Sequence, residues 1–476
     1  MMPPDVEYLR SQIIRHSELF LRDEALTLVS GANLRFMPYD SAVIQTGPIL
    51  AIPYDLPLSH EPLEKYSVAF GDTHLTLWNR VAKPSTGEWE SIPCDSAPVW
   101  YRNYSGTLIP AWNLFGTLFD LLTFGEEIRD HRRDGHKRYV ALYSPRREAG
   151  VLQVPIFNEA VAAIVAALAG LREDGNPRFE LGKLAKPPVA VLSHDCDISY
   201  GNDALTQAIR ALRIPLPLRR FRPPRISNFW WIISNVIWPR RFYFANNPGM
   251  IDLERAFGFT STFYLLNGTG GRFGARNGFK PIPEIVSCVP SGWKIGMHYN
   301  YDTLLNTQQF IAQRDQLASA VSDKITSGRA HYLRFDPERS LSFLSVQGIR
   351  VDESSGYPDY IGYRNGIAGV FQAYDATAHK SLDIWEVPMT VMDSTLVRQY
   401  GDDAIPEFRK LIFHLSRIGG AMSVIFHPGV FYNPEVPEML GVYHKMLMVL
   451  REFGVVSQHA TELANGSFSY EGVEHI

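Results

Sequence analysis

The chain has 476 residues, of which 45% are hydrophobic and 20% charged, so it is long enough for two or three domains around a sizeable core. Its 46 basic and 50 acidic residues leave a net charge of −4, which gives no global field that would attract nucleic acid. Cys94, Cys196 and Cys288 lie far apart, which excludes a disulfide framework and a zinc-finger spacing and fits a reducing compartment.

The first residues lack both a basic start and an apolar segment, and no apolar run of about 20 residues occurs in the chain. We therefore expect a cytoplasmic protein without a membrane-spanning helix. Arginines flank the aromatic residues of the segment 219–241, which favours three alternatives: peripheral contact with the inner face of a membrane, packing against the rest of the fold, or a basic lip over an anionic substrate.

The first part of the chain alternates short apolar runs, at 75–78 and 139–143, with turn-rich segments. An Ala-rich helix is predicted from an Asn158 cap to about Arg172, and the turn-forming residues 173–177 and 186–188 follow it. This pattern indicates a mixed α+β N-terminal accessory domain over residues 1–185 and a second domain over residues 186–476.

The second part has apolar runs that each lead to a polar side chain: 294–297 to His298, 331–333 to Arg334 and 423–426 to His427. A helical segment with Pro406 in its first turn and Gly419 at its end lies between two of the predicted strands. Parallel strands separated by helices, with reactive residues at the strand ends, predict an α/β fold, a (β/α) barrel with its site at the C-terminal mouth.

Two carboxylates follow the first predicted strand of this barrel, in the sequence Ser193-His194-Asp195-Cys196-Asp197. Asp195 and Asp197 share one face of an extended chain, whereas Cys196 points to the other face and is expected to pack in the core. Two like charges that close raise each other's cost of ionisation unless a cation uses them. The pair therefore indicates metal-assisted chemistry.

These segments resemble the motifs of NodB-type polysaccharide deacetylases, carbohydrate esterase family four, which have a distorted (β/α) barrel. The resemblance covers most of residues 188–430 and follows the order of the family's motifs, which are Ser193–Asp197 for the first, Gly296–Asp302 for the second, Leu333–Pro337 for the third and Val424–Pro428 for the late strand. Residues 362–366 and 387–393 look like signatures of a cytoplasmic two-domain subgroup, and residues 115–158 more weakly resemble that subgroup's N-terminal domain.

The resemblance implies hydrolysis of an acetyl group, most simply an N-acetyl group, from a sugar by one divalent cation, with zinc expected first and cobalt, nickel or manganese as alternatives. Asp195 would be the base, His427 the acid, and Arg334 would orient Asp195 and keep it ionised. The metal ligands carried over are Asp197, His298 and Asp302, where Asp302 replaces the family's usual second histidine.

Four further residues are expected to contact the substrate, namely Tyr299, His331, Arg364 and Asp393. Arg364 and Asp393 could instead form a structural ion pair, and His331 could instead be a reserve ligand or acid, or a satisfied structural histidine. The remaining histidines, including His136, are interpreted as surface or packing residues.

The expected substrate is an acetylated sugar or oligosaccharide, with a nucleotide-linked or lipid-linked precursor of a surface polysaccharide as one form. Two other functions stay open. The departure at Asp302 is compatible with an inactive barrel that binds carbohydrate or a nucleotide sugar, and the carboxylate pair is compatible with a glycosidase, although both acids come from one strand end. The oligomeric state is not indicated.

Overall fold

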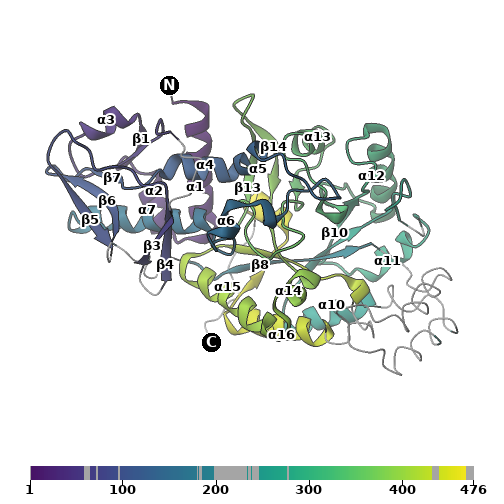
Figure 1. The fold of residues 1–476 in the computed structure, drawn as a ribbon. Helices are drawn as coiled ribbons and strands as arrows, with labels where there is room; N and C mark the ends of the chain where they lie inside the picture. Colours follow the sequence, from purple (N-terminus) through teal and green to yellow (C-terminus); the bar gives the residue numbers. More distant parts are fainter. Residues whose placement is uncertain are drawn as a thin grey trace.

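The computed structural model describes residues 2–57, 65–70, 73–94, 97–178, 181, 185–197, 233, 237, 246–275, 278–430 and 439–467 (Figure 1). Of the arginine- and aromatic-rich segment 219–241 only Ile233 and Ile237 are described, so the predicted membrane contact lies outside the described residues. None of the described helices is long and apolar enough to cross a membrane.

The N-terminal part forms a five-stranded sheet in the order β1-β2-β7-β6-β5 and a separate hairpin of β3 and β4. The strands are β1 (Leu34–Met37), β2 (Leu50–Pro53), β3 (Lys65–Phe70), β4 (Thr73–Trp78), β5 (Trp89–Cys94), β6 (Ala97–Asn103) and β7 (Leu108–Pro110). The helices are α1 (Pro4–Phe20), α2 (Asp23–Ser30), α3 (Tyr39–Val43), α4 (Leu114–Leu122), α5 (Gly125–Arg129), η1 (Ala141–Tyr143), α6 (Pro145–Glu148) and α7 (Ile156–Glu173). The mixed α+β character expected of this part is confirmed, but residues 139–143 include a short helix rather than a strand.

The Ala-rich helix α7 is present, yet Asn158 does not cap it. Pro155 occupies the cap position, and Asn158 is fully buried in the first turn. Its side-chain amide donates to the carbonyls of Ala368 and Gly419, both at 2.9 Å, and accepts from the Ala368 N–H at 2.9 Å. The residue therefore joins α7 to backbone that lies more than 200 positions later in the chain.

The second part is a curled sheet in the order β13-β14-β12-β11-β10-β9-β8-β16-β15, to which β17 adds beside β8. All the pairs are parallel except β13 with β14. The strands are β8 (Val189–Cys196), β9 (Ser261–Leu265), β10 (Lys294–Tyr299), β11 (Ser327–Ala330), β12 (Val351–Asp352), β13 (Phe371–Asp375), β14 (Lys380–Glu386), β15 (Met389–Met392), β16 (Ala421–Ile425) and β17 (Val456–Ser457).

Helices follow most of these strands and cover the outside of the sheet (Figure 1). They are α10 (Asn246–Phe257), α11 (Ile282–Cys288), α12 (Thr307–Val321), η3 (His331–Leu333), α13 (Ser340–Val346), α14 (Asp393–Tyr400), η4 (Gly401–Asp403), α15 (Ala404–Ile418), η5 (Pro428–Val430), α16 (Met439–Glu452) and α17 (Ala460–Asn465). The predicted α/β class, a distorted (β/α) barrel after an α+β part, is confirmed, and the curled sheet forms an incomplete barrel.

One predicted strand was displaced, since it begins four residues and ends three residues earlier in the chain than expected. The strand expected at 331–333 is β11, which ends at Ala330, and residues 331–333 form the short helix η3. The sequence Ser-Gly-Arg-Ala of β11 carries almost no apolar signal, because its largest side chain, that of Arg329, is charged. This displacement changes which arginine lies inside the barrel.

Large rings pack over glycines on both faces of the curled sheet, Tyr264 on the inner face beside Arg329 and Tyr299 on the outer face beside α12. A Cβ atom added to Gly296 would lie 2.3 Å from the ring of Tyr264, and one added to Gly328 would lie 2.2 Å from the ring of Tyr299. Both tyrosines are fully buried. Tyr299, expected at the substrate site, instead faces away from His298 and packs between the sheet and α12, where its ring centroid lies 5.5 Å from that of Phe310.

The hydrophobic core is continuous across residue 185. One cluster of buried side chains includes Leu9 of α1 and Trp100 of β6 together with Phe263 of β9 and Phe371 of β13. The helix α1 also bonds to β13, since the Tyr8 hydroxyl donates to Gln372 O at 2.7 Å and Gln372 N donates to the Gln12 side chain at 3.0 Å. The division at residue 185 stays a prediction.

Candidate metal centre

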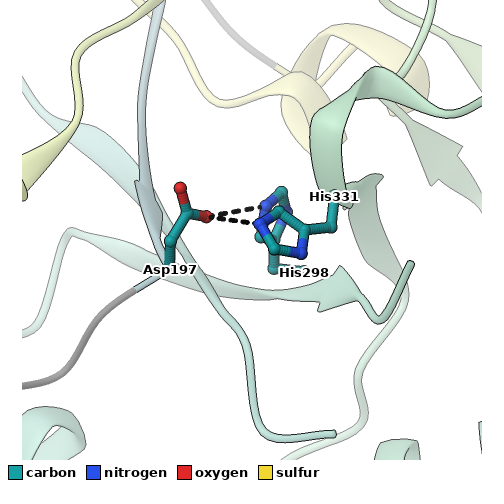
Figure 2. Close-up of side chains that lie close together, drawn as sticks. All are labelled: Asp197, His298 and His331. Carbon is teal, nitrogen blue, oxygen red and sulfur yellow. Dashed lines mark ion pairs between the residues drawn. The ribbon is translucent and has the colours of Figure 1, made fainter. Parts of the chain in front are cut away.

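The described polar side chains that could hold a metal ion lie at the C-terminal ends of neighbouring parallel strands. Asp197 follows β8 directly, His298 lies in the last part of β10, and His331 follows β11. Because parallel strands β8, β9, β10 and β11 are adjacent, their ends bring these residues together at one mouth of the barrel. Figure 2 shows the carboxylate of Asp197 facing both imidazoles.

The three side chains form one compact ligand set. Asp197 Oδ1 lies 3.0 Å from His298 Nε2 and 3.6 Å from His331 Nε2, and one ligand atom of each residue lies within 4.8 Å of the other two. His298 and His331 are buried, and Asp197 is half-buried. One carboxylate and two imidazoles are a donor set that suits zinc and neighbouring transition metals.

The hydrogen bonding of His298 favours a cation between these groups. His298 Nδ1 lies 3.0 Å from the carbonyl of Arg329, which can only accept a hydrogen bond, so Nδ1 carries the proton. In the neutral imidazole, Nε2 then presents a lone pair to Asp197 Oδ1, an oxygen that is buried without a hydrogen-bond donor among the described residues. Two facing acceptors at 3.0 Å fit a shared cation, and a backbone partner on the far nitrogen is the usual support of a histidine ligand.

Electrostatics keep the ligand atoms available. Burial alone would raise the pKa of Asp197, but His331, His298 and His427 outweigh it and hold this pKa well below its usual range. Burial lowers the pKa of His331 to about 4 despite the nearby carboxylates. Near neutral pH the site therefore presents an ionised carboxylate and a neutral imidazole at His331, the protonation states that metal ligation requires.

Asp195 belongs to a buried ionic network beside this cluster. Arg329 donates to Asp195 Oδ1 at 2.6 Å, to Glu353 Oε2 at 2.7 Å and to Ser193 Oγ at 2.8 Å. Arg329 and Glu353 are fully buried. Burial raises the pKa of Asp195, yet Arg329 and the two nearby histidines His298 and His427 outweigh this effect and leave it lowered. Asp195 is thus an ionised carboxylate at the edge of the metal centre.

A histidine and aspartate pair lies on another side of the cluster. His427 follows β16, and its Nδ1 lies 3.0 Å from Asp393 Oδ1, while its backbone N–H donates to Asp393 Oδ2 at 2.7 Å. His427 Nε2 lies 3.9 Å from Asp197 Oδ2 and so faces the cluster. Burial lowers the pKa of His427, but the charge and hydrogen bond of Asp393, together with Asp197 and Asp195, raise it to about 10.

The structure places Asp393, which was expected to contact the substrate, behind His427. It is fully buried at the start of α14, and both of its oxygens face His427. Its role is to fix the ring and its proton on Nδ1.

Three other predicted residues take part in different contacts. It is Arg329, not Arg334, that pairs with Asp195; Arg334 donates to the Tyr301 carbonyl at 2.6 Å and lies over the Tyr301 ring. Arg364, expected at the substrate or in an ion pair with Asp393, is buried and forms an ion pair with Glu127 of α5 instead. Asp302 is exposed next to Gly271, outside the ligand set, and His331 takes the third place.

Cys196 fulfils its prediction, since its side chain is buried in the core cluster and burial raises the pKa of its thiol well above the usual range. Two contributors were missed by the sequence reasoning. Arg329 is preceded by Gly328 in a strand without apolar periodicity, and Glu353 follows only a short strand, so neither gave a recognisable signal.

No family model matches the chain, and no curated protein matches it. Among solved structures, the allantoinase PuuE is 13% identical with a TM-score of 0.39, over 58% of this chain and 89% of the allantoinase. A probable polysaccharide deacetylase from Pseudomonas aeruginosa is 12% identical with a TM-score of 0.39, over 60% of this chain and 93% of that protein. The peptidoglycan deacetylase PdaC from Bacillus subtilis, in a mutant structure, is 11% identical with a TM-score of 0.30, over 59% and 91%. These likenesses are too distant to assign a function, which rests instead on the site.

Proposed function

We propose that the chain is a metal-dependent deacetylase that hydrolyses an acetyl group, most simply an N-acetyl group, from a sugar. The observation that carries this proposal is the juxtaposition of an Asp-His-His ligand set, Asp197, His298 and His331, with an ionised carboxylate and a histidine and aspartate pair. Metal-assisted hydrolysis of an amide uses an electrophilic cation, a base for water and an acid for the leaving group, and the strand ends provide residues for each.

A divalent cation held by Asp197, His298 and His331 would polarise the acetyl carbonyl and lower the pKa of a water at the same place. Asp195 accepts a proton from that water while the oxygen of the water bonds to the carbonyl carbon. Arg329 keeps Asp195 ionised before this step. His427 donates a proton from Nε2 to the leaving nitrogen when the C–N bond breaks, because its Nδ1 is held by Asp393. The products are acetate and an amino sugar.

The metal identity, zinc first, follows from the mixed carboxylate and imidazole set. A cytoplasmic location and a nucleotide-linked or lipid-linked precursor of a surface polysaccharide are proposals from the sequence alone. The burial of Arg364 against Glu127 removes one of the cations that favoured an anionic substrate. We therefore propose an acetylated sugar or oligosaccharide as the substrate class.

The glycosidase alternative is disfavoured by the positions of the two acids. That chemistry needs two carboxyl groups on either side of a glycosidic bond. Asp195 and Asp197 come from one strand end, and each is already engaged, one with Arg329 and the other with two histidines. The alternative of an inactive barrel that only binds carbohydrate would be excluded by acetate release from an acetylated sugar.

The first prediction tests the ligand set by metal analysis and acetate release on the purified protein. Substituting His331→Ala or His298→Ala should lower bound metal at least tenfold, because each removes one of three ligands. Asp302→Ala is the matched control and should retain the metal. Metal loss in Asp302→Ala with full occupancy in His331→Ala would reinstate Asp302 as the ligand and contradict the assignment.

The second prediction separates the base from the ligands. Asp195→Asn should retain the metal but release no measurable acetate, since an amide cannot accept the proton of the attacking water. Acetate release by Asp195→Asn at the wild-type rate would remove Asp195 from the mechanism. Release of no acetate from any acetylated sugar by the wild-type, metal-loaded protein would favour the binding-only alternative.

A further inference from the structure

Four rings gather beside the metal centre and form what we call the aromatic platform: His136, Phe273, Tyr301 and Tyr332. The ring centroids of Phe273 lie 4.7 Å from Tyr301 and 4.8 Å from Tyr332, and the rings of His136 and Tyr332 stack at 4.8 Å with an interplanar angle of 24°. Phe273 and Tyr301 come from the loops after β9 and β10, and Tyr332 comes from the short helix η3 after β11. His136 comes from the N-terminal part, whose chain after α5 extends over the side of the barrel that carries β10 (Figure 1).

The platform is continuous with the metal centre. Tyr332 directly follows the candidate ligand His331, and the two ring centroids lie 4.6 Å apart. Tyr332 is 39% exposed, which is high for a ring that touches four other aromatic side chains. A molecule at the metal centre would therefore meet the free surface of Tyr332 next.

The backbone at Tyr332 is strained and is held by the N-terminal part. Tyr332 and Leu333 have φ values of 62° and 53°, a region that costs a residue other than glycine on the order of 1 kcal/mol or more. Arg138 donates to the Tyr332 carbonyl at 2.7 Å, and two bonds from Arg138 to Asp134 Oδ2, at 3.0 and 2.8 Å, fix the guanidinium. Strain maintained in this way beside a reactive centre is typical of a functional position.

From these observations we infer that Tyr332 and its aromatic platform bind the sugar unit next to the one that carries the acetyl group. This inference rests on the proposed deacetylase function and specifies its substrate as an oligosaccharide rather than a monosaccharide. The C–H face of a pyranose ring packs on an aromatic face, and a stack braced from behind by His136 presents that face at little cost in side-chain entropy. The exposed guanidinium of Arg272, which lies over Phe273 at 5.2 Å, supplies donors for sugar oxygens at the rim.

The inference makes His136 and Arg138 positioning residues. They do not reach the reacting atoms; they hold Tyr332 in its strained conformation. The N-terminal part would thus help to determine which oligosaccharides bind at the mouth of the barrel.

The test compares acetate release from N-acetylglucosamine and from its β-1,4-linked tetramer. Tyr332→Ala should raise KM for the tetramer at least tenfold relative to the monosaccharide, whereas Tyr332→Phe should stay within about twofold of the wild type because it keeps the ring. His136→Ala should raise KM for the tetramer with little change in kcat, and His136→Phe should restore it. Tyr104→Ala, at a ring that is 83% exposed and outside the site, is the control. Equal effects of Tyr332→Ala on both substrates would overturn the inference.

A binding measurement keeps the inference separable from the proposed function. Saturation-transfer NMR on Asp195→Asn, with the N-acetylglucosamine tetramer and acetylated xylotetraose as probes, needs no turnover. We expect contact to at least one probe and its loss on adding Tyr332→Ala, with metal content unchanged in both proteins. Failure of both probes to bind, or binding that survives Tyr332→Ala, would overturn the platform even if the protein releases acetate. A protein that binds through Tyr332 but releases no acetate would overturn only the deacetylase proposal.

Discussion

Arg329 neutralises two carboxylates, those of Asp195 and Glu353, inside the barrel. Arg329→Met would leave both acids buried without a cation, and removal of one partner from a buried ionic group costs about 3–5 kcal/mol. Our third prediction is a loss of that size in the free energy of unfolding, measured by urea denaturation. Arg334→Met, which loses only a bond to the Tyr301 carbonyl and a ring contact, is the control and should lose less. Equal losses would show that Arg329 does not carry the network.

The charge of Asp393 sets the proton affinity of His427. Asp393 favours the imidazolium, so Asp393→Asn should lower the pKa of His427 from about 10 toward its ordinary value of about 6.5. The acid then loses its proton at lower pH, and the fourth prediction is that the alkaline limb of kcat/KM moves at least one pH unit toward acid. Asp402→Asn, at an exposed position, should leave the profile in place. An unmoved alkaline limb in Asp393→Asn would exclude His427 as the titrating acid.

Site residues could be predicted where a reactive side chain ends an apolar run, as at Asp195, His298 and His427. Arg329 could not be predicted in this way, because it is a charged side chain buried in β11 at a position where an apolar side chain is expected. The third ligand was misplaced for a related reason. The motif resemblance placed it at Asp302, while His331 reaches the site only through the pairing of β10 with β11. Which strands pair with each other depends on the whole fold and cannot be predicted from a single sequence.

At the scale of elements, α7 is attached to the barrel through one side chain. Asn158→Ala would leave the Ala368 N–H without its partner in a buried place, at a cost of about 1–3 kcal/mol. The fifth prediction is a loss of this size in unfolding free energy, with Asn33→Ala as the control, since Asn33 makes a bond to the Pro48 carbonyl at an exposed position. A loss no larger than that of Asn33→Ala would show that the buried bonds are replaced by water.

Elements with a strong periodic signal were predicted well. Helix α15 begins near Pro406 and ends before Gly419, whose φ of 76° suits glycine, and β8, β10 and β16 coincide with apolar runs. Elsewhere, polar contacts that exist only in the folded protein determined the position of a residue against its local sequence preference. Asn158 has the chemistry of a helix cap, but it lies in the first turn of α7, where its side chain makes buried bonds to Ala368 and Gly419.

At the scale of the whole molecule, one buried histidine makes the fold less stable in acid. His16 of α1 is 1% exposed, packs on Phe20 and Phe157, and burial lowers its pKa to about 3. As pH falls below about 6.5, the unfolded chain takes up a proton at this residue and the folded protein does not, so the free energy of unfolding decreases. Between pH 7 and pH 5 the wild type should lose about 2 kcal/mol more than His16→Met. Parallel curves for the two proteins would show that His16 is protonated when folded.

The bonds between α1 and β13 have a consequence for synthesis of the chain. About 350 residues separate Phe20 from Phe371, so at roughly 5–20 residues per second α1 leaves the ribosome on the order of 20–70 s before its partner strand exists. During that interval Tyr8 and Gln12 of α1 lack their partner Gln372 of β13. The contacts that join α1 to the curled sheet can therefore form only late in synthesis, after β13 has emerged.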